Sequence, residues 1–336
     1  VINEIREQKS ITPKEIRDNY LDTVYDDIII NVKDEQTKQM KEKIFGLPLS
    51  VDTLAMYYNK DLFNNAGIIN PPKYWNKDFQ NNVKKLTKLD ERGGVLQSGT
   101  ALGGSANKER SSDILSILMM QNGAKMMEGN SVLFSKSFEA DKTNPGLEAL
   151  AFYTDFGNPA KEVYGWNKDL NNSVDMFAQG NLAIMFGYAY HLPIIRAKAP
   201  KLNFSIAPLP QIEGSGEEIN FANYWVETVM AKSKNTNEAW DFIQFAAKAE
   251  NVKSYLEKTK KPTALRSLIE EEKEDFDIGV FAKQLLTAKS WYKGKDAVAM
   301  EKIFNDMIDE MLSADPENDP KNIINRAASK VQQTID

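Results

Sequence analysis

Cysteine is absent from the 336 residues of this chain, and histidine occurs once, as His191. Without thiols the protein has no disulfide, no thiolate nucleophile, no cysteine-held iron–sulfur cluster and no cysteine-type zinc site. A site that needs several histidines is also excluded, and any Ser-His-Asp triad would have to use His191. We therefore expect no metal site and no cofactor.

The chain also lacks a long apolar run and an excess of basic charge. No stretch approaches the roughly 18 consecutive apolar residues that indicate a membrane-spanning helix. The 42 basic and 48 acidic side chains leave a net charge of −6 without a basic stripe, so we expect no binding to nucleic acid. A hydrophobic content of 42% over this length predicts a folded chain with two domains.

Signature motifs of common enzyme classes are missing too. The sequence has no G-x-S-x-G, no P-loop, no H-E-x-x-H and no G-x-G-x-x-G after a strand. The glycine pair at 103–104 is not followed by the Lys-Ser/Thr of a phosphate loop, so it predicts a turn with amides open to a ligand. His191 has no serine in a nucleophile context nearby, which favours a structural role. We predict a non-enzyme without catalytic residues.

Helical and strand-like patterns alternate along the chain, which is typical of α/β architecture. Apolar residues at spacings of three and four predict a helix over 300–312. Asp319 followed by Pro320 predicts the start of a last helix. Residues 111–120 predict another helix, which ends before Gly123.

Shorter patterns complete the expected elements. Asn235 and Glu238 resemble a capping box at the start of a helix. Residues 1–43 are polar and predict helix rather than the buried strand that usually opens an α/β domain. The strand candidates are 44–49, 54–58, 182–186, 204–207 and 226–231.

Aromatic residues are the main positive signal for function. Many stand at the ends of segments or beside turn residues rather than inside apolar stripes, namely Tyr57, Tyr58, Tyr74, Trp75, Trp166, Tyr188, Tyr190, Tyr224, Trp225, Trp291 and Tyr292. Flat rings with a polar handle suit the faces of sugar rings, while neighbouring polar groups bind the hydroxyls. Any single ring could equally belong to the core, so the grouping predicts a cleft for a carbohydrate.

Several segments together resemble one family. They are 43–49 (KIFGLPL), 51–63 (VDTLAMYYNKDLF), 66–68 (AGI), 71–75 (PPKYW), 177–187 (FAQGNLAIMFG), 207–210 (APLP) and 234–243 (KNTNEAWDFI). Their order and spacing are similar to those of extracellular (periplasmic) solute-binding proteins of ABC importers, family 1, the maltose-binding-protein-like group. The resemblance covers most of residues 11–336.

The resemblance implies an α/β fold of the two-lobed periplasmic-binding-protein (Venus flytrap, type II) architecture, which closes on ligand about a hinge. By analogy, residues 1–53 and 230–266 form the first lobe, and 54–229 and 267–336 form the second. The family's opening strand, helix and strand have no counterpart in this sequence. We therefore expect the first lobe to lack its N-terminal βα units.

The resemblance also implies ligand-binding residues at matching positions. Asp52 matches a carboxylate that binds sugar hydroxyls in maltose-binding relatives. Tyr188 and Tyr190 follow the segment where relatives place an aromatic platform, with Ala189 at the position of the usual Trp. The other expected ligand contacts are Tyr224, Trp225, Trp291, Ser105 and Asn107.

We expect the substrate-binding subunit of an ABC importer, which captures a carbohydrate, an oligosaccharide by preference, between its lobes. The alternatives are the same fold with a polyamine, a peptide or an anion as solute, and a carbohydrate-active hydrolase that uses two carboxylates. The expected partner is a transmembrane permease, and the chain is expected to act as a monomer. Its expected location is extracytoplasmic, periplasmic or at the cell surface, with lipid anchoring left open.

Overall fold

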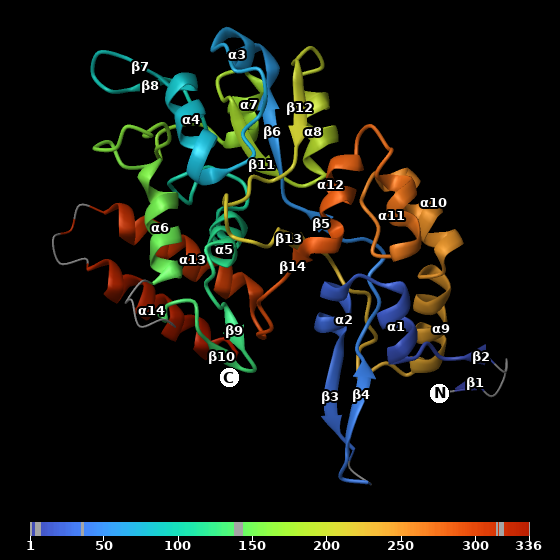
Figure 1. Ribbon diagram of the computed structural model, residues 1–336. Helices are drawn as coiled ribbons and strands as arrows, with labels where there is room; N and C mark the ends of the chain where they lie inside the picture. The colour runs from blue at the N-terminus through green and yellow to red at the C-terminus, as the bar shows by residue number, and fades with distance from the viewer. Residues whose placement is uncertain are drawn as a thin grey trace. The chain divides into compact units, whose positions relative to one another are not determined.

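The computed structural model describes residues 2–3, 8–34, 37–137, 144–313, 315 and 319–335. The chain forms two compact units (Figure 1). Unit 1 comprises residues 1–53, 188–190 and 220–290, and unit 2 comprises 54–187, 191–219 and 291–336. The chain thus passes from one unit to the other several times.

Unit 1 is built mainly from helices around one apolar core. Its helices are α1 (Pro13–Asn19), α2 (Asp22–Ile28), α9 (Thr236–Ala246), α10 (Ala249–Thr259), α11 (Arg266–Glu272) and α12 (Gly279–Gln284), with a 3-10 turn η2 (Leu285–Thr287). Helix α1 begins with a capping box, in which the Thr12 hydroxyl accepts from the Glu15 amide and the Glu15 carboxylate accepts from the Thr12 amide. Residues far apart in the sequence, such as Val24 and Val252, share the buried core.

Short strands complete unit 1. Strand β13 (Asn220–Asn223) pairs antiparallel with β5 (Asp52–Thr53) and parallel with β14 (Ala288–Lys289). Strands β1 (Ile2–Asn3) and β2 (Gln8–Lys9) form a small antiparallel pair. This placement of residues 220–290 differs from the division expected by analogy, which assigned 220–229 and 267–290 to the second lobe. The strand pairs explain the difference, because β13 and β14 bond to each other and β13 bonds to β5.

Residues 29–33 and 40–44 form an antiparallel strand pair, not the helix that the polar N-terminal pattern predicts. Strand β3 (Ile29–Lys33) pairs with β4 (Met40–Ile44), in a register that places Ile29 opposite Ile44. The β-branched residues Ile29, Ile30 and Val32 favour strand over helix at the side-chain level. Within residues 1–43, the helix prediction is confirmed only for α1 and α2. Residues 1, 4–7, 35 and 36 lie outside the described residues.

Unit 2 contains a three-stranded sheet. Strand β6 (Ala55–Asn59) lies between β11 (Ile184–Gly187) and β12 (Phe204–Ala207), and both neighbours run antiparallel to it. These three strands confirm the predictions for 54–58, 182–186 and 204–207. The other two strand predictions are wrong, because in 226–231 only Glu227 makes a bridge, to Leu47, and in 44–49 only Ile44 belongs to a strand.

Helices cover much of unit 2 (Figure 1). They are α3 (Lys60–Asn65), a π-helical turn η1 (Trp75–Phe79), α4 (Gln80–Leu86), α5 (Ser111–Gln121), α6 (Pro145–Asp155), α7 (Ser173–Ala178), α8 (His191–Lys198), α13 (Ala297–Leu312) and α14 (Pro320–Gln333). Two hairpins accompany them, β7 (Lys88–Leu89) with β8 (Val95–Gln97) and β9 (Met127–Glu128) with β10 (Ser131–Val132).

The helix signals in the sequence have mixed outcomes. The predictions for α5, α13 and α14 are confirmed, with Asp319 as the N-cap of α14 and Gly123 in the left-handed region after α5. The capping box at Asn235 is wrong in its detail, because Asn235 precedes α9 but its side chain makes no capping bond within the described chain. None of the helices that the structure describes is long and apolar enough to cross a membrane.

Candidate functional site

Asp52 on β5 is buried and holds the segment 188–190 to unit 1. The Ala189 amide donates to its Oδ2 atom at 2.9 Å and to Oδ1 at 3.2 Å, and the Thr53 amide donates to Oδ1 at 2.9 Å. Burial raises the pKa of Asp52 to about 7, although these amides and the charge of Lys261 act in the opposite direction. The carboxyl group expected to bind a sugar is therefore engaged with backbone amides.

Tyr188 and Tyr190 form a stacked pair in that segment. Their ring centroids lie 5.9 Å apart with an interplanar angle of 24°. Tyr188 is fully buried, whereas Tyr190 is 38% exposed. Tyr190 therefore presents an aromatic ring to solvent with a second ring packed against it.

Tyr224 and Trp225 follow β13, whose residue Asn223 pairs with Asp52. The Tyr224 hydroxyl donates to the carboxylate of Asp27, and burial together with that carboxylate raises the pKa of Tyr224 well above its usual range. Trp225 is 84% exposed. Tyr224 thus links the end of β13 to α2, while the side chain of Trp225 is exposed to solvent.

These contacts bring five of the eight predicted ligand-binding residues around the β5–β13 pair of unit 1. The five are Asp52, Tyr188, Tyr190, Tyr224 and Trp225. Two of them, Tyr190 and Trp225, expose aromatic rings. Solvent-exposed aromatic rings beside backbone polar groups are able to stack on the apolar face of a sugar.

The other three predicted residues lie in unit 2, where their polar groups already have partners. Ser105 Oγ donates to Asp309 Oδ2 at 2.6 Å. The Asn107 side chain donates to the carbonyls of Asn167 and Leu170 at 2.8 and 2.7 Å and accepts from Trp166 Nε1. Trp291 is buried and donates from Nε1 to Ser116 Oγ at 3.0 Å. These contacts stabilise unit 2.

His191, the single histidine, is buried at the start of α8. Its ring centroid lies 6.5 Å from that of Tyr57, and its Nε2 atom is 4.0 Å from Glu109 Oε2. The neighbouring His191 imidazole is the main cause that lowers the pKa of Glu109. Packing on Tyr57 and pairing with Glu109 favour the structural role that the sequence predicts.

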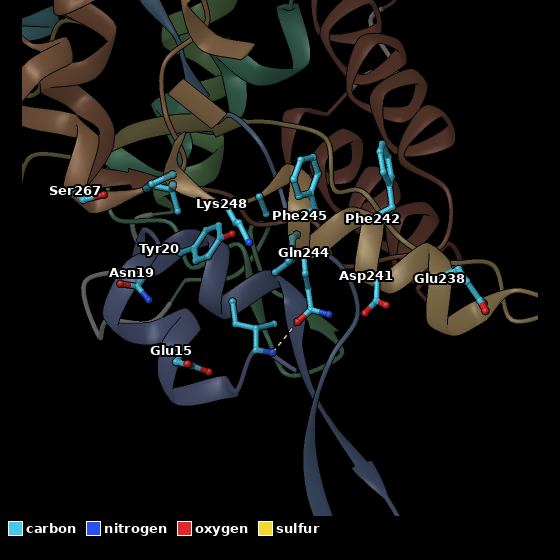
Figure 2. A pocket seen from close by; sticks show the side chains of 15 residues that line it. Glu15, Asn19, Tyr20, Glu238, Asp241, Phe242, Gln244, Phe245, Lys248 and Ser267 are labelled. Carbon is cyan, nitrogen blue, oxygen red and sulfur yellow. Dashed lines mark hydrogen bonds between the residues drawn. The ribbon is translucent and has the colours of Figure 1, made fainter. Parts of the chain in front are cut away.

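A groove in unit 1 has a volume of about 800 Å³ and was not predicted from the sequence (Figure 2). Helix α1 lies on one side of it with Glu15 and Asn19, and α9 lies on the other with Phe242 and Phe245. The Ile11 amide donates to Gln244 Oε1 at 2.8 Å. None of the eight predicted ligand-binding residues lines this groove. The one sequence feature that could have indicated this groove is that α9 has apolar residues on more than one of its faces.

No group of three or more side chains able to hold a metal ion occurs in the part of the chain that the structure describes. The buried carboxyl group of Asp52 has backbone amides and Lys261 as its neighbours rather than further carboxylates.

Comparison with known proteins defines the family. The family model described as bacterial extracellular solute-binding protein matches residues 9–253. The chain belongs to this family. A binding protein of Brucella abortus is 28% identical over 207 residues, which cover 60% of this chain and 46% of that protein. The maltodextrin-binding protein MdxE of Bacillus subtilis is 26% identical over 275 residues, which cover 77% of this chain and 60% of that protein. This solute-binding protein thus spans about half the length of these relatives, which are named as binding proteins.

Solved structures establish the fold. A cyclo/maltodextrin-binding protein complexed with maltotetraose has a TM-score of 0.70 at 16% identity and covers 98% of this chain and 77% of its own. The sugar-binding protein MalE of Xanthomonas citri has a TM-score of 0.70 at 17% identity and covers 97% and 78%. The expected α/β fold of the type II periplasmic binding proteins is confirmed by these likenesses.

Proposed function

We propose that this solute-binding protein is the substrate-binding subunit of an ABC importer and captures a carbohydrate, an oligosaccharide by preference, through closure about a hinge. The observation that carries the proposal is the pair of open rings, Tyr190 and Trp225, held near the β5–β13 pair. The family match and the maltodextrin-binding relative support the same ligand class.

Each predicted residue takes a specific part in this proposal. Tyr190 and Trp225 stack on the apolar faces of sugar rings, since aromatic rings with a polar handle suit such faces. Asp52 positions Tyr190, because its carboxyl group accepts from the amide of the neighbouring Ala189. Tyr188 supports the ring of Tyr190 from the buried side.

The remaining predicted ligand contacts take supporting parts. Tyr224 holds the strand end that precedes Trp225 through its bond to Asp27. Three further residues stabilise unit 2 by side-chain hydrogen bonds: Ser105 with Asp309, Asn107 with Trp166, and Trp291 with Ser116.

Location and partners follow from the proposed function. A binding subunit of an importer works outside the cytoplasm and delivers its solute to a transmembrane permease, and we propose both for this protein as a monomer. No enzymatic step, cofactor or nucleic acid enters the proposal.

Thermal unfolding in the presence of a sugar panel tests the ligand class. A ligand that binds only the native state stabilises it by RT ln(1 + [L]/Kd), about 2.7 kcal/mol at one hundred times Kd. We expect maltodextrins or another oligosaccharide to raise the melting temperature. Polyamines, short peptides and inorganic anions form the comparison panel. A rise with one of these and none with any sugar would contradict the carbohydrate assignment.

A further inference from the structure

Strands β5, β13 and β14 form one sheet of unit 1, and each of them stands where the chain passes between the two units. Strand β5 ends at Thr53, β13 begins at Asn220, and β14 is followed by Ser290. These three residues are also the borders of unit 1 along the chain. The groups that hold the ends of this sheet therefore fix the places at which the chain enters and leaves unit 1.

Asp27 of α2 accepts hydrogen bonds from the residues that follow two of these strands. Its Oδ2 atom accepts from the Ser290 hydroxyl at 2.6 Å and from the Tyr224 hydroxyl. Tyr224 lies directly after β13, and Ser290 lies directly after β14. One carboxylate oxygen thus links the ends of two strands to one helix.

Thr23, four residues before Asp27 on α2, adds to this anchor. The Ser290 amide donates to Thr23 Oγ1 at 3.2 Å, and the Tyr224 hydroxyl lies 3.3 Å from the Thr23 carbonyl oxygen. Residues four apart lie on the same face of a helix, so Thr23 and Asp27 form one polar surface. Ser290 is therefore held through its amide as well as its hydroxyl.

Helix α5 fixes the same two stretches of chain on the side of unit 2. Gln121 Nε2 donates to the Ile219 carbonyl at 2.8 Å, and Ser116 Oγ accepts from Trp291 Nε1 at 3.0 Å. Ile219 directly precedes β13, and Trp291 directly follows Ser290. Each connection is thus anchored within each unit, and only a few residues remain between its two anchors to take up the backbone rotation of a hinge.

The anchor on α2 is also connected to the proposed solute site. Tyr224 is followed by the exposed Trp225, and Asn223 before it pairs with Asp52. Because the Tyr224 ring is bound at its hydroxyl, rotation of the backbone beside it is restricted, and so is the direction of the Trp225 side chain. Contacts that hold a binding residue in place before the ligand arrives raise affinity, because less conformational entropy is lost on binding.

We propose that Asp27 is a positioning residue of the solute site. It fixes the strand ends at Tyr224 and Ser290 to α2, and thereby holds Trp225 and the passage out of unit 1 in the arrangement that binds solute. Asp27 acts through these residues and not by contact with the solute. This proposal rests on the proposed function, because it gives a part in solute binding to a residue outside the aromatic set.

Hydrogen–deuterium exchange of the full chain without solute tests the anchor. Asp27→Leu removes the acceptor, whereas Asp27→Asn keeps an oxygen that is able to accept from both hydroxyls. We expect Asp27→Leu to raise exchange about tenfold in peptides covering 220–225 and 288–292, and Asp27→Asn to stay within about threefold of wild type. Asp22→Leu is the matched control, because Asp22 is an exposed carboxylate of α2 that pairs with Arg266. Unchanged exchange in Asp27→Leu would overturn the proposal.

Isothermal titration calorimetry with maltotetraose tests the effect on the solute site, and the sugar that raises the melting temperature most replaces this probe if wild type does not bind it. We expect Asp27→Leu to weaken binding about tenfold, or about 1.4 kcal/mol. Asp27→Asn and Asp22→Leu should bind within about threefold of wild type. Tyr224→Phe and Ser290→Ala should each weaken binding about threefold in wild type and not at all in Asp27→Leu, which already lacks the contact.

Three results of the titrations would overturn the proposal. Additive losses from Asp27→Leu and the two donor substitutions would indicate direct contact between Asp27 and the sugar. Equal affinities of wild type and Asp27→Leu, with a lower free energy of unfolding in the variant, would leave Asp27 a purely structural role. A wild type that binds no sugar would contradict the proposed function itself, and this result is distinct from the other two, in which wild type binds.

A second variant keeps the test valid if Asp27→Leu does not fold, which far-ultraviolet circular dichroism shows. The double substitution Tyr224→Phe with Ser290→Ala removes both donors and leaves the carboxylate in place. It should raise exchange in the same two peptides and weaken sugar binding about tenfold. Exchange and affinity equal to those of wild type would overturn the proposal.

Discussion

Asp52 illustrates how a single side chain positions the candidate site. Its carboxyl group is buried, accepts amides from Thr53 and Ala189, and lies on a strand that pairs with β13. The segment that it holds carries Tyr190, and the strand that it pairs with leads to Trp225. Asp52 thus contacts the segment that carries Tyr190 and pairs with the strand that precedes Trp225.

The raised pKa of Asp52 predicts a pH dependence of stability. Because its pKa is about 7 in the folded protein, the native state binds a proton more tightly than the unfolded chain. Asp52 therefore lowers the free energy of unfolding as pH rises from about 4 to about 7. Asp52→Asn should remove this part of the slope in urea titrations at pH 5 and pH 8. An exposed control, Asp169→Asn, should keep it. An unchanged slope in Asp52→Asn would contradict the prediction.

Lys108 of unit 2 predicts a stabilising substitution. It is buried, its Nζ has no hydrogen-bond partner among the described residues, and it lies 4.9 Å from the centroid of the Tyr153 ring. Burial lowers the pKa of Lys108 well below its usual range, although Asp309 acts in the opposite direction. Lys108→Met keeps most of the length of the side chain and removes the buried amine. We expect the free energy of unfolding to rise by about 1–3 kcal/mol at pH 6.

The pH dependence of the gain in stability distinguishes removal of the buried amine from an improvement in packing. The pKa of Lys108 is lower in the folded protein than in the unfolded chain, so wild type becomes more stable as pH rises between these two values. The gain in the free energy of unfolding from Lys108→Met should therefore shrink toward pH 10. Urea titrations at pH 6 and pH 10 measure it, with Lys168→Met, an exposed lysine, as the control. A loss of stability at pH 6 would show that the amine has a stabilising contact.

At the scale of elements, the sequence predicts helices and strands that have a strong apolar periodicity. It does not predict segments whose conformation depends on a strand-pairing partner. Helices α13 and α14 and strands β6, β11 and β12 follow apolar patterns that burial requires. The β3–β4 strand pair is polar and has no such pattern, so the pairing of the two strands decides their conformation. Residues 226–231 have strand-forming side chains, but only Glu227 finds a bridge partner.

Helix caps give a matched test at this scale. The capping box belongs to Thr12 at α1, whereas Asn235 at α9 makes no side-chain cap within the described chain. Thr12→Ala should therefore lower the free energy of unfolding by about 1 kcal/mol, and Asn235→Ala should change it by a few tenths. Chemical denaturation of both variants measures the difference. Equal losses in the two variants would contradict the assignment of the cap to Thr12.

The candidate site was predictable in its location along the chain but not in the exposure of each ring. The sequence does not show which ring of an aromatic group is buried and which faces solvent, because tertiary packing decides this. Tyr188 and Trp291 are buried, whereas Tyr190 and Trp225 are exposed. The groove beside α9 was missed because its lining comes from residues 11–20, 47, 238–249 and 265–267, which only the fold brings together.

At the scale of the whole molecule, the family and the fold agree with the motifs in the sequence. The match over residues 9–253 and the likeness to type II periplasmic binding proteins both extend beyond the motif segments. The chain passes between its two units after Thr53, Gly187, Tyr190, Ile219 and Ser290. Repeated passage of this kind suits a protein in which ligand binding is linked to hinge closure.

Isothermal titration calorimetry with the oligosaccharide that raises the melting temperature most directly tests the central claim. Wild type, Trp225→Ala and Phe276→Ala are compared, since Trp225 and Phe276 are both largely exposed aromatic residues of unit 1. The proposed function predicts that wild type and Phe276→Ala bind the sugar equally and that Trp225→Ala binds at least tenfold more weakly, a loss of about 1.4 kcal/mol. Equal affinity in Trp225→Ala and wild type would contradict the assignment of the sugar surface.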